Sequence, residues 1–367
     1  MPNFLQAFSV IGGTMSFSRK ITDWYEENGR SLPWRNIDDP YKIWLSEIIL
    51  QQTRIEQGMS YYLRFIEEYP TVADLAAASE DHVLKTWQGL GYYSRARNLH
   101  AAARYIVDEC GGIFPDTYSG ILKLKGVGRY TAAAIASFAF RLPHPVIDGN
   151  VYRLISRLYG IYTPIGTDSA YTEFENILSR LIDRERPDIF NQAIMDFGSI
   201  YCKPVPADCE RCIFHNECVA RKEGKVTMLP VKAASAQVRQ RWLYYYYIEW
   251  EHNGERLIFV HQRTGKDIWK GLYEFPLLET DHELTSAELE TQSNSFLSSL
   301  SDNYTLCPTP PKTFTHKLTH RTINATFVHA ILYDYTPQEG TNETLLPEEK
   351  LKKLPISRLI DRYLSKR

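Results

Sequence analysis

One carboxylate stands in a sequence context that suits acid catalysis. Glu47 lies within Trp44-Leu45-Ser46-Glu47-Ile48-Ile49-Leu50, a predicted helix with apolar residues on both sides of the carboxyl group. Burial disfavours the charged form, so the pKa of Glu47 should rise and keep part of the group protonated near neutrality. A glutamate on a helix is more often a solvated surface residue, and this segment alone leaves that interpretation open.

A glycine-containing turn lies further along the chain. Lys125-Gly126-Val127-Gly128-Arg129-Tyr130 places two glycines one residue apart, and an alanine-rich run then begins a helix. The N–H groups of such a turn and of the helix N-terminus can bind a phosphate oxygen, although a lone Gly-X-Gly turn usually just connects two helices. The whole string is more specific and resembles the hairpin of the helix-hairpin-helix DNA glycosylases. Asp148 lies where that superfamily places its catalytic aspartate.

Four of the six cysteines are crowded together in the pattern C-x6-C-x2-C-x5-C: Cys202, Cys209, Cys212 and Cys218. In a chain without an export signal, this crowding indicates a metal site rather than disulfides. Structural zinc usually takes two short paired motifs, and only Cys209 and Cys212 have that spacing. The pattern resembles the 4Fe-4S loop of endonuclease III and its relatives. Four thiolates by themselves suit either metal, so zinc remains the alternative.

Five more motifs carry a closer resemblance. They are Pro33-Trp34-Arg35, Ser46-Glu47-Ile48-Ile49-Leu50-Gln51-Gln52-Thr53, Gly89-Leu90-Gly91-Tyr92-Tyr93, Ile147-Asp148-Gly149-Asn150 and Asn191-Gln192-Ala193. With the cysteines, they resemble the A/G-specific adenine DNA glycosylases, the MutY family, from about Ser16 into the C-terminal part of the chain. Lys125 departs from the family, which usually has proline there. Lysine should cost some rigidity of the turn but adds a cation near the phosphate.

The resemblance implies a division of labour between two carboxylates. Glu47 would be the general acid that protonates adenine, and ionised Asp148 would stabilise the cationic sugar and help deliver water. Tyr130 and Asn150 would line the sugar side of the site. In the bifunctional endonuclease III type, the residue at position 130 is a lysine that attacks the sugar. Because a phenol cannot form a Schiff base, we expect a monofunctional glycosylase that leaves an abasic site.

Two other functions compete with this interpretation. The first is a bifunctional endonuclease III-like glycosylase for oxidised pyrimidines, which Tyr130 and the additional C-terminal domain disfavour. The second is a noncatalytic iron–sulfur protein that binds DNA or senses redox state, which would need neither Glu47 nor Asp148.

The same resemblance implies two sets of binding residues. An adenine extruded from the duplex would be held by Arg30, Trp34, Arg35 and Gln192. The duplex itself would contact Gln52, Leu90, Tyr92, Lys125, Gly126 and Gly128, although Leu90 is equally well explained as a core residue.

Hydrophobic periodicity divides the chain into two parts. From Phe17 to Arg221, apolar residues recur every three or four positions between proline and glycine breakers, which predicts helices throughout. Strand patterns follow at 242–250, 256–261 and 322–332, with a helical stretch at 283–300. We expect an all-α helix-hairpin-helix glycosylase domain over 1–221 with its 4Fe-4S cluster loop at 202–218, a linker over 222–237, and an α+β Nudix-like domain over 238–367.

The Nudix resemblance rests on Lys266-Asp267-Ile268-Trp269-Lys270-Gly271-Leu272-Tyr273-Glu274-Phe275-Pro276. Residues 277–290 lack the Arg-Glu-x-x-Glu-Glu helix of a working Nudix hydrolase, which favours a recognition role over metal-dependent hydrolysis. The MutY family contacts oxidised guanine through His-x-Phe-Ser-His, and the best match here is His316-Lys317-Leu318-Thr319-His320. We therefore expect Leu318, Thr319 and His320 to recognise the lesion. A rival register, Phe314-Thr315-His316, keeps the aromatic residue but loses the leading histidine.

The charge distribution is compatible with a DNA partner. The formal net charge is −2, but residues 82–160 hold ten Lys or Arg against four acidic residues, which fits a phosphate-contacting face or a solvated helical face. The expected partner is double-stranded DNA containing A:8-oxoguanine or A:G mispairs. No run of 18 apolar residues occurs, and residues 4–11 do not form a signal peptide, so we expect a location in the bacterial cytoplasm, associated with the nucleoid. We also expect a monomer. Met15 is a second possible start.

Overall fold

The protein is described by a computed structural model covering residues 14–205, 207–233, 238–308, 310–318, 321–337 and 343–366. Contacts divide the chain into two compact units. One comprises Met1–Ala76 with Ala101–Ala234, and the other comprises Ala77–His100 with Ser235–Arg367. The second unit thus contains a segment of 24 residues that is distant from the rest of it in the sequence. Among the described residues, no helix is both long and apolar enough to cross a membrane.

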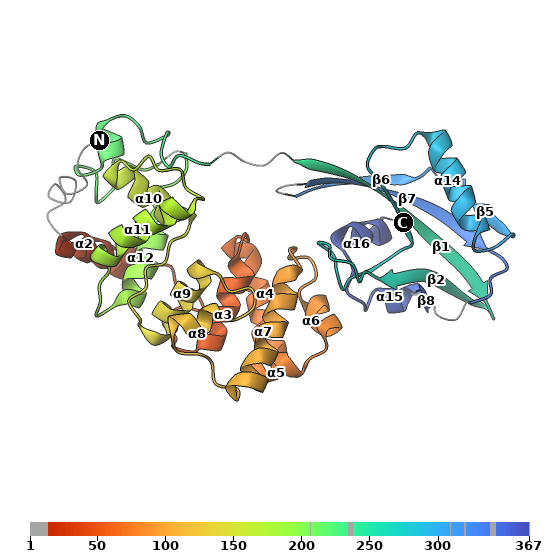
Figure 1. Ribbon diagram of the computed structural model, residues 1–367, viewed down its shortest axis with the longest axis horizontal. Coiled ribbons are helices and arrows are strands. Elements are labelled where there is room, and N and C mark those ends of the chain that lie inside the picture. Colours follow the sequence, from red (N-terminus) through yellow and green to blue (C-terminus); the bar gives the residue numbers. More distant parts are fainter. Residues whose placement is uncertain are drawn as a thin grey trace. The chain divides into compact units, whose positions relative to one another are not determined.

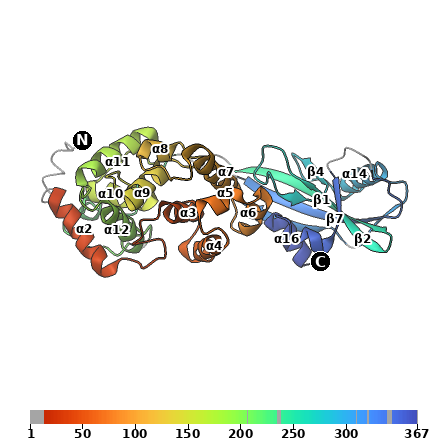
Figure 2. The same ribbon diagram turned by 90° about the horizontal axis from the view of Figure 1, so that it is seen from below.

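The first unit is helical, as the periodicity predicted. Its helices are α2 (Thr14–Asn28), α3 (Pro40–Leu50), α4 (Ile55–Glu68), α5 (Val72–Ala77), α8 (Tyr118–Leu122), α9 (Arg129–Phe140), α10 (Gly149–Tyr159), α11 (Asp168–Leu181), α12 (Pro187–Ile200) and α13 (Val219–Lys222). The second half of α7 (Ser94–Cys110) also belongs to this unit. Helix α2 lies beside α11 and α12 in both views (Figures 1 and 2).

An aromatic core joins α2 and α12 to the cysteine loop. Phe17, Phe197 and Phe214 are fully buried. The Phe214 ring stacks on Phe17 with 5.1 Å between centroids and meets Phe197 edge-on at 5.4 Å. Burying one such side chain contributes roughly 2 to 3 kcal/mol, so Phe214 holds the cysteine loop against the helices independently of any metal.

The second unit is a mixed sheet with helices on both faces, which confirms the α+β expectation. Its strands are β1 (Arg239–His252), β2 (Glu255–Gln262), β3 (Tyr273–Glu274), β4 (Leu277–Thr280), β5 (Tyr304–Leu306), β6 (Lys312–Lys317), β7 (Arg321–Leu332) and β8 (Glu343–Pro347). The order is β3-β2-β1-β7-β5, with β4 paired to β1, β6 to β7 and β8 to β2. Its helices are α6 (Glu80–Thr86), α14 (Ser286–Ser298), α15 (Glu348–Leu351) and α16 (Arg358–Ser365).

Four consecutive tyrosines are buried because β1 is central and both of its faces are covered. Strand β1 runs parallel to β7 from Arg239↔Arg321 to Trp250↔Leu332. On one face, Tyr246 packs against Phe296 of α14. On the other face, the Tyr247 ring packs against the Tyr363 ring of α16, with 5.6 Å between centroids. Figure 1 shows α14 and α16 on these opposite sides of the sheet.

Candidate active site

The eight residues expected to act on adenine or its sugar line one pocket of about 210 Å³. They are Arg30, Trp34, Arg35, Glu47, Tyr130, Asp148, Asn150 and Gln192. These residues come from the segment between α2 and α3, and from α3, α9, the start of α10, and α12. Residues that are far apart in sequence therefore meet at one concave site, where a flipped base could be bound.

Glu47 is presented by a helix with a defined start. Asp39 caps α3 by accepting hydrogen bonds from the N–H groups of Tyr41 and Lys42 at 3.0 and 3.3 Å, and Pro40 occupies the first helical position. Two turns later, the Glu47 side chain is only 7% exposed. Burial raises its pKa to about 7, although the phenol of Tyr130 and the charge of Arg35 partly oppose the rise. Near neutrality Glu47 is a mixture of acid and anion.

Asp148 is the N-cap of α10, which gives its carboxylate a different environment. It accepts hydrogen bonds from the N–H groups of Asn150 and Val151 at 2.9 and 2.7 Å, and from Asn150 Nδ2 at 2.7 Å. Burial raises the pKa of Asp148, whereas these three bonds oppose the rise because they favour the anion. The helix N-terminus acts in the same direction.

Tyr130 interacts with both carboxylates. Burial and the nearby charges of Glu47 and Asp148 raise its pKa well above the usual value, so the phenol stays protonated and donates a hydrogen bond to Glu47. A protonated phenol holds Glu47 in place without supplying an amine. The position therefore offers no nucleophile of the lysine type.

Asp196 was not foreseen from the sequence. It is fully buried and accepts bonds from Arg30 Nε at 2.9 Å and from Arg35 Nη2 at 2.7 Å. Although burial alone raises the pKa of Asp196, the two guanidinium groups hold it below the usual value. Tyr25 OH also receives a bond from Arg35 and donates to Gln192 Oε1 at 3.0 Å. One aspartate thus orders the cationic side of the pocket.

Two further residues support the Asp148 segment and were also missed. Asn191 accepts a hydrogen bond from Val146 N–H at 2.9 Å and donates to His144 O at 2.9 Å, so it fixes the chain just before Asp148. Arg153 donates to Asn150 Oδ1 at 2.8 Å and to the carbonyl of Cys202 at 2.5 Å. A continuous chain of bonds therefore runs from Asp148 through Asn150 and Arg153 to the cysteine loop. The one sequence feature that could have identified Asn191 is its position next to Gln192, in the same motif.

The predicted phosphate-binding turn connects α8 to α9. Gly126 has a φ of +81°, a conformation that favours glycine. Gly128 is the N-cap of α9 with no side-chain cap bond, and a Cβ atom there would have no neighbour within 4 Å. The fold itself does not require glycine at Gly128, so the open backbone is available to an external group.

The residues expected to enter the duplex differ in exposure. Gln52 is exposed with a φ of +54°, and Tyr92 is 44% exposed with a φ of +49°. Leu90 is only 6% exposed and packs inside its unit, which agrees with its alternative interpretation as a core residue. Of the lesion-recognition residues, Leu318 donates its N–H to Arg321 O at 2.7 Å, whereas Thr319 and His320 lie outside the described residues.

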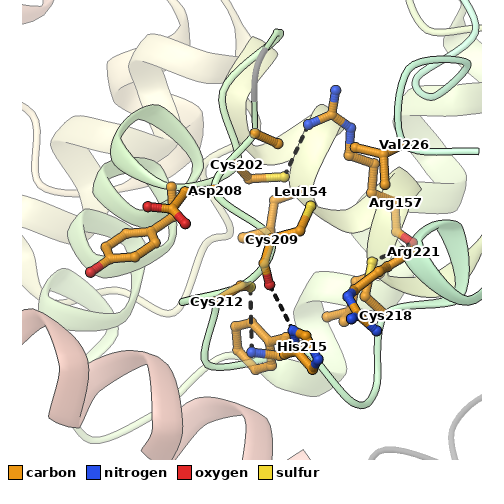
Figure 3. A pocket seen from close by; sticks show the side chains of 14 residues that line it. Leu154, Arg157, Cys202, Asp208, Cys209, Cys212, His215, Cys218, Arg221 and Val226 are labelled. Atoms are coloured by element: carbon orange, nitrogen blue, oxygen red, sulfur yellow. Dashed lines mark hydrogen bonds between the residues drawn. The ribbon is translucent and has the colours of Figure 1, made fainter. Parts of the chain in front are cut away.

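The four clustered cysteines line one largely apolar cavity, together with side chains such as Leu154 and Val226 (Figure 3). Phe214 also lines this cavity. Arg157 Nη1 donates to Cys202 Sγ at 3.4 Å, and the Phe214 N–H donates to Cys212 Sγ at 3.4 Å. Such donors stabilise sulfur that carries negative charge. In the part of the chain that the structure describes, no three His, Cys, Asp or Glu residues are arranged to hold a single metal ion.

Comparisons with known proteins define the class. Residues 45–182 match the family model of the HhH-GPD superfamily base excision DNA repair proteins, and residues 245–366 match the NUDIX domain. A thermostable thymine-DNA glycosylase is 28% identical with a TM-score of 0.54, and the match covers 57% of this chain and 97% of that one. Endonuclease III trapped on DNA shares the fold at 23% identity and a TM-score of 0.51. The helical unit has the fold of a helix-hairpin-helix base excision repair protein.

Sequence relatives narrow the class to one family. The adenine DNA glycosylase of Buchnera aphidicola subsp. Baizongia pistaciae is 32% identical over 90% of this chain and 91% of its own length. That of Buchnera aphidicola subsp. Acyrthosiphon pisum is 35% identical over 73% of this chain and 75% of its own length. The chain belongs to the adenine DNA glycosylase family, and it is a hydrolase that acts on the N-glycosidic bond. The resemblance drawn from the motifs is confirmed, and the noncatalytic alternative is excluded.

Proposed function

We propose that this chain is a monofunctional glycosylase that excises adenine mispaired with 8-oxoguanine or guanine and leaves an abasic site. The observation that carries the proposal is the pairing of Glu47 and Asp148 in one pocket. One carboxyl group has a pKa of about 7, and the other accepts three hydrogen bonds that favour its anion. Two carboxyl groups in different environments can serve as acid and as anionic stabiliser in the same reaction.

In the proposed mechanism, protonated Glu47 donates to N7 of the flipped adenine, which turns the base into a better leaving group. As the glycosidic bond breaks, positive charge develops on the sugar, and the Asp148 carboxylate stabilises it and orients water for attack. Asn150 holds Asp148 in position through its side-chain amide. Adenine departs, water adds to C1′, and the sugar remains in the strand as an abasic site. Tyr130 cannot form a Schiff base, so we expect no strand scission.

Different residues would bind the flipped adenine and the DNA backbone. Arg35 and Gln192, ordered by Asp196 and Tyr25, would hold the edge of the adenine, with Trp34 and Arg30 enclosing it. The open N-terminus of α9 at Gly126 and Gly128 would bind a DNA phosphate, with Lys125 adding charge. Gln52 and Tyr92, which are both exposed, would each contact the duplex where the base has left it.

The cysteine set fits a 4Fe-4S cluster better than zinc. Its spacing is that of the endonuclease III loop, and the cavity supplies four thiols with donors aimed at two of the sulfur atoms. Cys202, Cys209, Cys212 and Cys218 would hold the cluster, which in this fold would brace the loop that Phe214 packs onto the helices. Through Arg153, that loop contacts Asn150 and so supports the position of Asp148.

We assign recognition of 8-oxoguanine to the connection between β6 and β7, with Leu318, Thr319 and His320 as its residues. The rival register would use Phe314, but this ring is 8% exposed and packs edge-on against Phe327 with 5.7 Å between centroids. A core side chain cannot stack on a base without unpacking the sheet. The Thr319 hydroxyl can accept from the N7–H that 8-oxoguanine has and guanine lacks.

A duplex with adenine opposite 8-oxoguanine tests the proposal directly. The adenine strand is end-labelled, incubated with the protein, and divided into a sample treated with hot alkali and an untreated one. We expect cleavage at the adenine only after alkali, and none with Glu47→Gln. Cleavage in the untreated sample would indicate a bifunctional enzyme of the endonuclease III type, and no cleavage in either sample would refute adenine excision from this mispair.

A further inference from the structure

The turn between α6 and α7 presents an aromatic side chain from a closely defined backbone. Gly89, Gly91 and Tyr92 have φ values of +97°, +80° and +49°. Trp87 Nε1 and Arg95 Nη2 both donate to the Gly91 carbonyl, at 2.9 and 3.2 Å. The Arg95 guanidinium lies over the Tyr92 ring, 5.6 Å from its centroid. These contacts fix the path of the turn, and they lie within the second unit.

The segment 352–356, which leads into α16, is the first anchor of this turn. Lys85, in the last turn of α6, donates from Nζ to the carbonyl groups of Lys352 and Leu354, at 2.6 and 3.2 Å. These carbonyl groups follow α15, so they lack partners within that helix. One ammonium group therefore joins the end of α6 to a segment about 270 positions later in the chain.

The same segment also bonds to both ends of the turn. The Ile356 N–H donates to Gln88 Oε1 at 3.3 Å, and Tyr93 OH donates to the Ile356 carbonyl at 3.3 Å. Gln88 precedes Gly89 and Tyr93 follows Tyr92, so the single residue Ile356 bonds across the turn. Ile356 is itself 2% exposed and bridges to Tyr273 of the sheet.

The second anchor lies between β2 and β3. Asp81, at the start of α6, accepts hydrogen bonds from Gln262 Nε2 at 2.9 Å and from Tyr273 OH at 3.2 Å. Arg97, in the first turn of α7, donates to the carbonyl of Lys270. The two helices that flank the turn are thus both bonded to the region between residues 262 and 273.

This second anchor continues toward the proposed lesion-recognition residues. Gly271 has a φ of +82°, and a Cβ atom there would lie 3.0 Å from Leu84 of α6, so the loop packs closely on that helix. Two residues earlier, the buried ring of Trp269 faces His316, with 6.4 Å between centroids. His316 is the next-to-last residue of β6, two positions before Leu318, where the connection assigned to 8-oxoguanine begins.

We propose that Asp81, Lys85 and Arg97 are positioning residues that fix the Tyr92 turn to the lesion-recognition part of the second unit. The distance between the side chain that enters the duplex and the residues that contact 8-oxoguanine is then set by one rigid frame. Recognition of the lesion and insertion of Tyr92 occur together, because both belong to this frame. This inference rests on the proposed function, in which Tyr92 fills the vacated space in the duplex.

The test uses the full-length protein and a duplex with 2-aminopurine beside 8-oxoguanine. The target is 2′-fluoroadenosine, which resists excision, so the fluorescence of 2-aminopurine at saturating protein reports only unstacking. We expect Lys85→Met/Arg97→Met to reduce the fluorescence rise and to lower single-turnover excision of ordinary adenine roughly five- to tenfold, because the three hydrogen bonds to the anchors are lost. The affinity for undamaged duplex should be unchanged, because a positioning role does not alter phosphate contacts.

Three matched variants complete the experiment. Lys353→Met removes an exposed lysine whose side chain makes none of the anchor hydrogen bonds described above, and it should behave as wild type. The single variant Lys85→Arg retains a donor at position 85 and leaves Arg97 unchanged. Its fluorescence rise should therefore exceed that of the double variant. Asp81→Asn, which changes only one charge, should reproduce the defect more weakly and provides the test if the double variant does not fold.

Tyr92→Ala separates failure of this inference from failure of the proposed function. If Tyr92→Ala abolishes the rise while the double variant and Asp81→Asn both match wild type, the anchors do not position the turn and the inference is wrong. If Tyr92→Ala leaves the rise intact, Tyr92 does not enter the duplex, and the inference falls with that assignment. A loss in both Tyr92→Ala and the anchor variants, with Lys353→Met unaffected, supports it.

Discussion

Asp196 holds the Arg35 guanidinium with two hydrogen bonds, from Nη1 to Oδ2 at 2.5 Å and from Nη2 to Oδ1 at 2.7 Å. The aspartate is fully buried and the arginine side chain is 9% exposed. Arg35 in turn opposes the rise in the pKa of Glu47. A residue that was absent from the sequence-based site therefore influences both the pocket and its acid.

Replacing Asp196 should be strongly destabilising. Asp196→Asn removes the negative charge that accepts both hydrogen bonds from the Arg35 guanidinium. Breaking a buried ion pair costs about 3 to 5 kcal/mol. Asp23→Asn is the matched control, because its pair with Arg19 is exposed, at 3.7 Å, and should contribute less than about 1 kcal/mol. The free energy of unfolding from urea titration measures both. Equal losses in the two variants would contradict a structural role for Asp196.

Excision should depend on pH through Glu47. Its pKa is about 7, and the protonated form is the active acid. The single-turnover rate on A:8-oxoguanine should be constant below this pKa and fall about tenfold per pH unit above it. A rate that stays flat between pH 6 and 9 would show that Glu47 is not the proton donor in the rate-determining step.

Stability should depend on the same group. A carboxyl group whose pKa is raised in the folded state contributes most to the stability of the fold below its ordinary pKa of 4.5. This contribution is lost as the pH rises through about 7. Glu47→Gln should thus increase the free energy of unfolding at pH 8 by up to roughly 3 kcal/mol, with much less effect at pH 5. Urea titrations of both proteins at the two pH values measure the difference. An effect of equal size at both would mean that burial of charge is not the cause.

The cysteine loop should hold iron and sulfide. Protein purified without oxygen should be straw-brown and contain about four iron and four sulfide per chain, and Cys212→Ser should lower both. Cys307→Ser is the control, because this cysteine lies in the other unit. Stoichiometric zinc without iron in the anaerobic preparation would instead establish the zinc alternative.

Preference for 8-oxoguanine over guanine should depend on Thr319. One hydrogen bond to the lesion corresponds to roughly 1 to 3 kcal/mol, or about five- to a hundredfold in discrimination, so Thr319→Ala should lower the ratio of the two excision rates within that range. Thr315→Ala is the control, because Thr315 already donates to Asn324 within the sheet at 3.2 Å. If only Thr315→Ala lowered the ratio, the rival register would be correct.

Much of this protein could be predicted from local sequence. The helical periodicity, the strand pattern around four tyrosines and the Nudix-like segment gave the fold class, because each element follows from the residues within it. Motifs around Glu47, Asp148 and Gln192 gave residues that line one pocket, since their short-range context matched a known family. The cysteine spacing likewise indicated a metal loop, because the four thiols lie within a single short segment of the chain.

Tertiary structure alone decided the contacts that support these residues. Asp196 is 161 positions from Arg35, and Cys202 is 49 positions from the Arg153 side chain that connects it to Asn150. Residues 77–100 group with the C-terminal unit, although their periodicity is that of the helical part. No local pattern encodes such pairs, because an ion pair or hydrogen bond between distant segments exists only once packing has brought their backbones together and excluded water from around them.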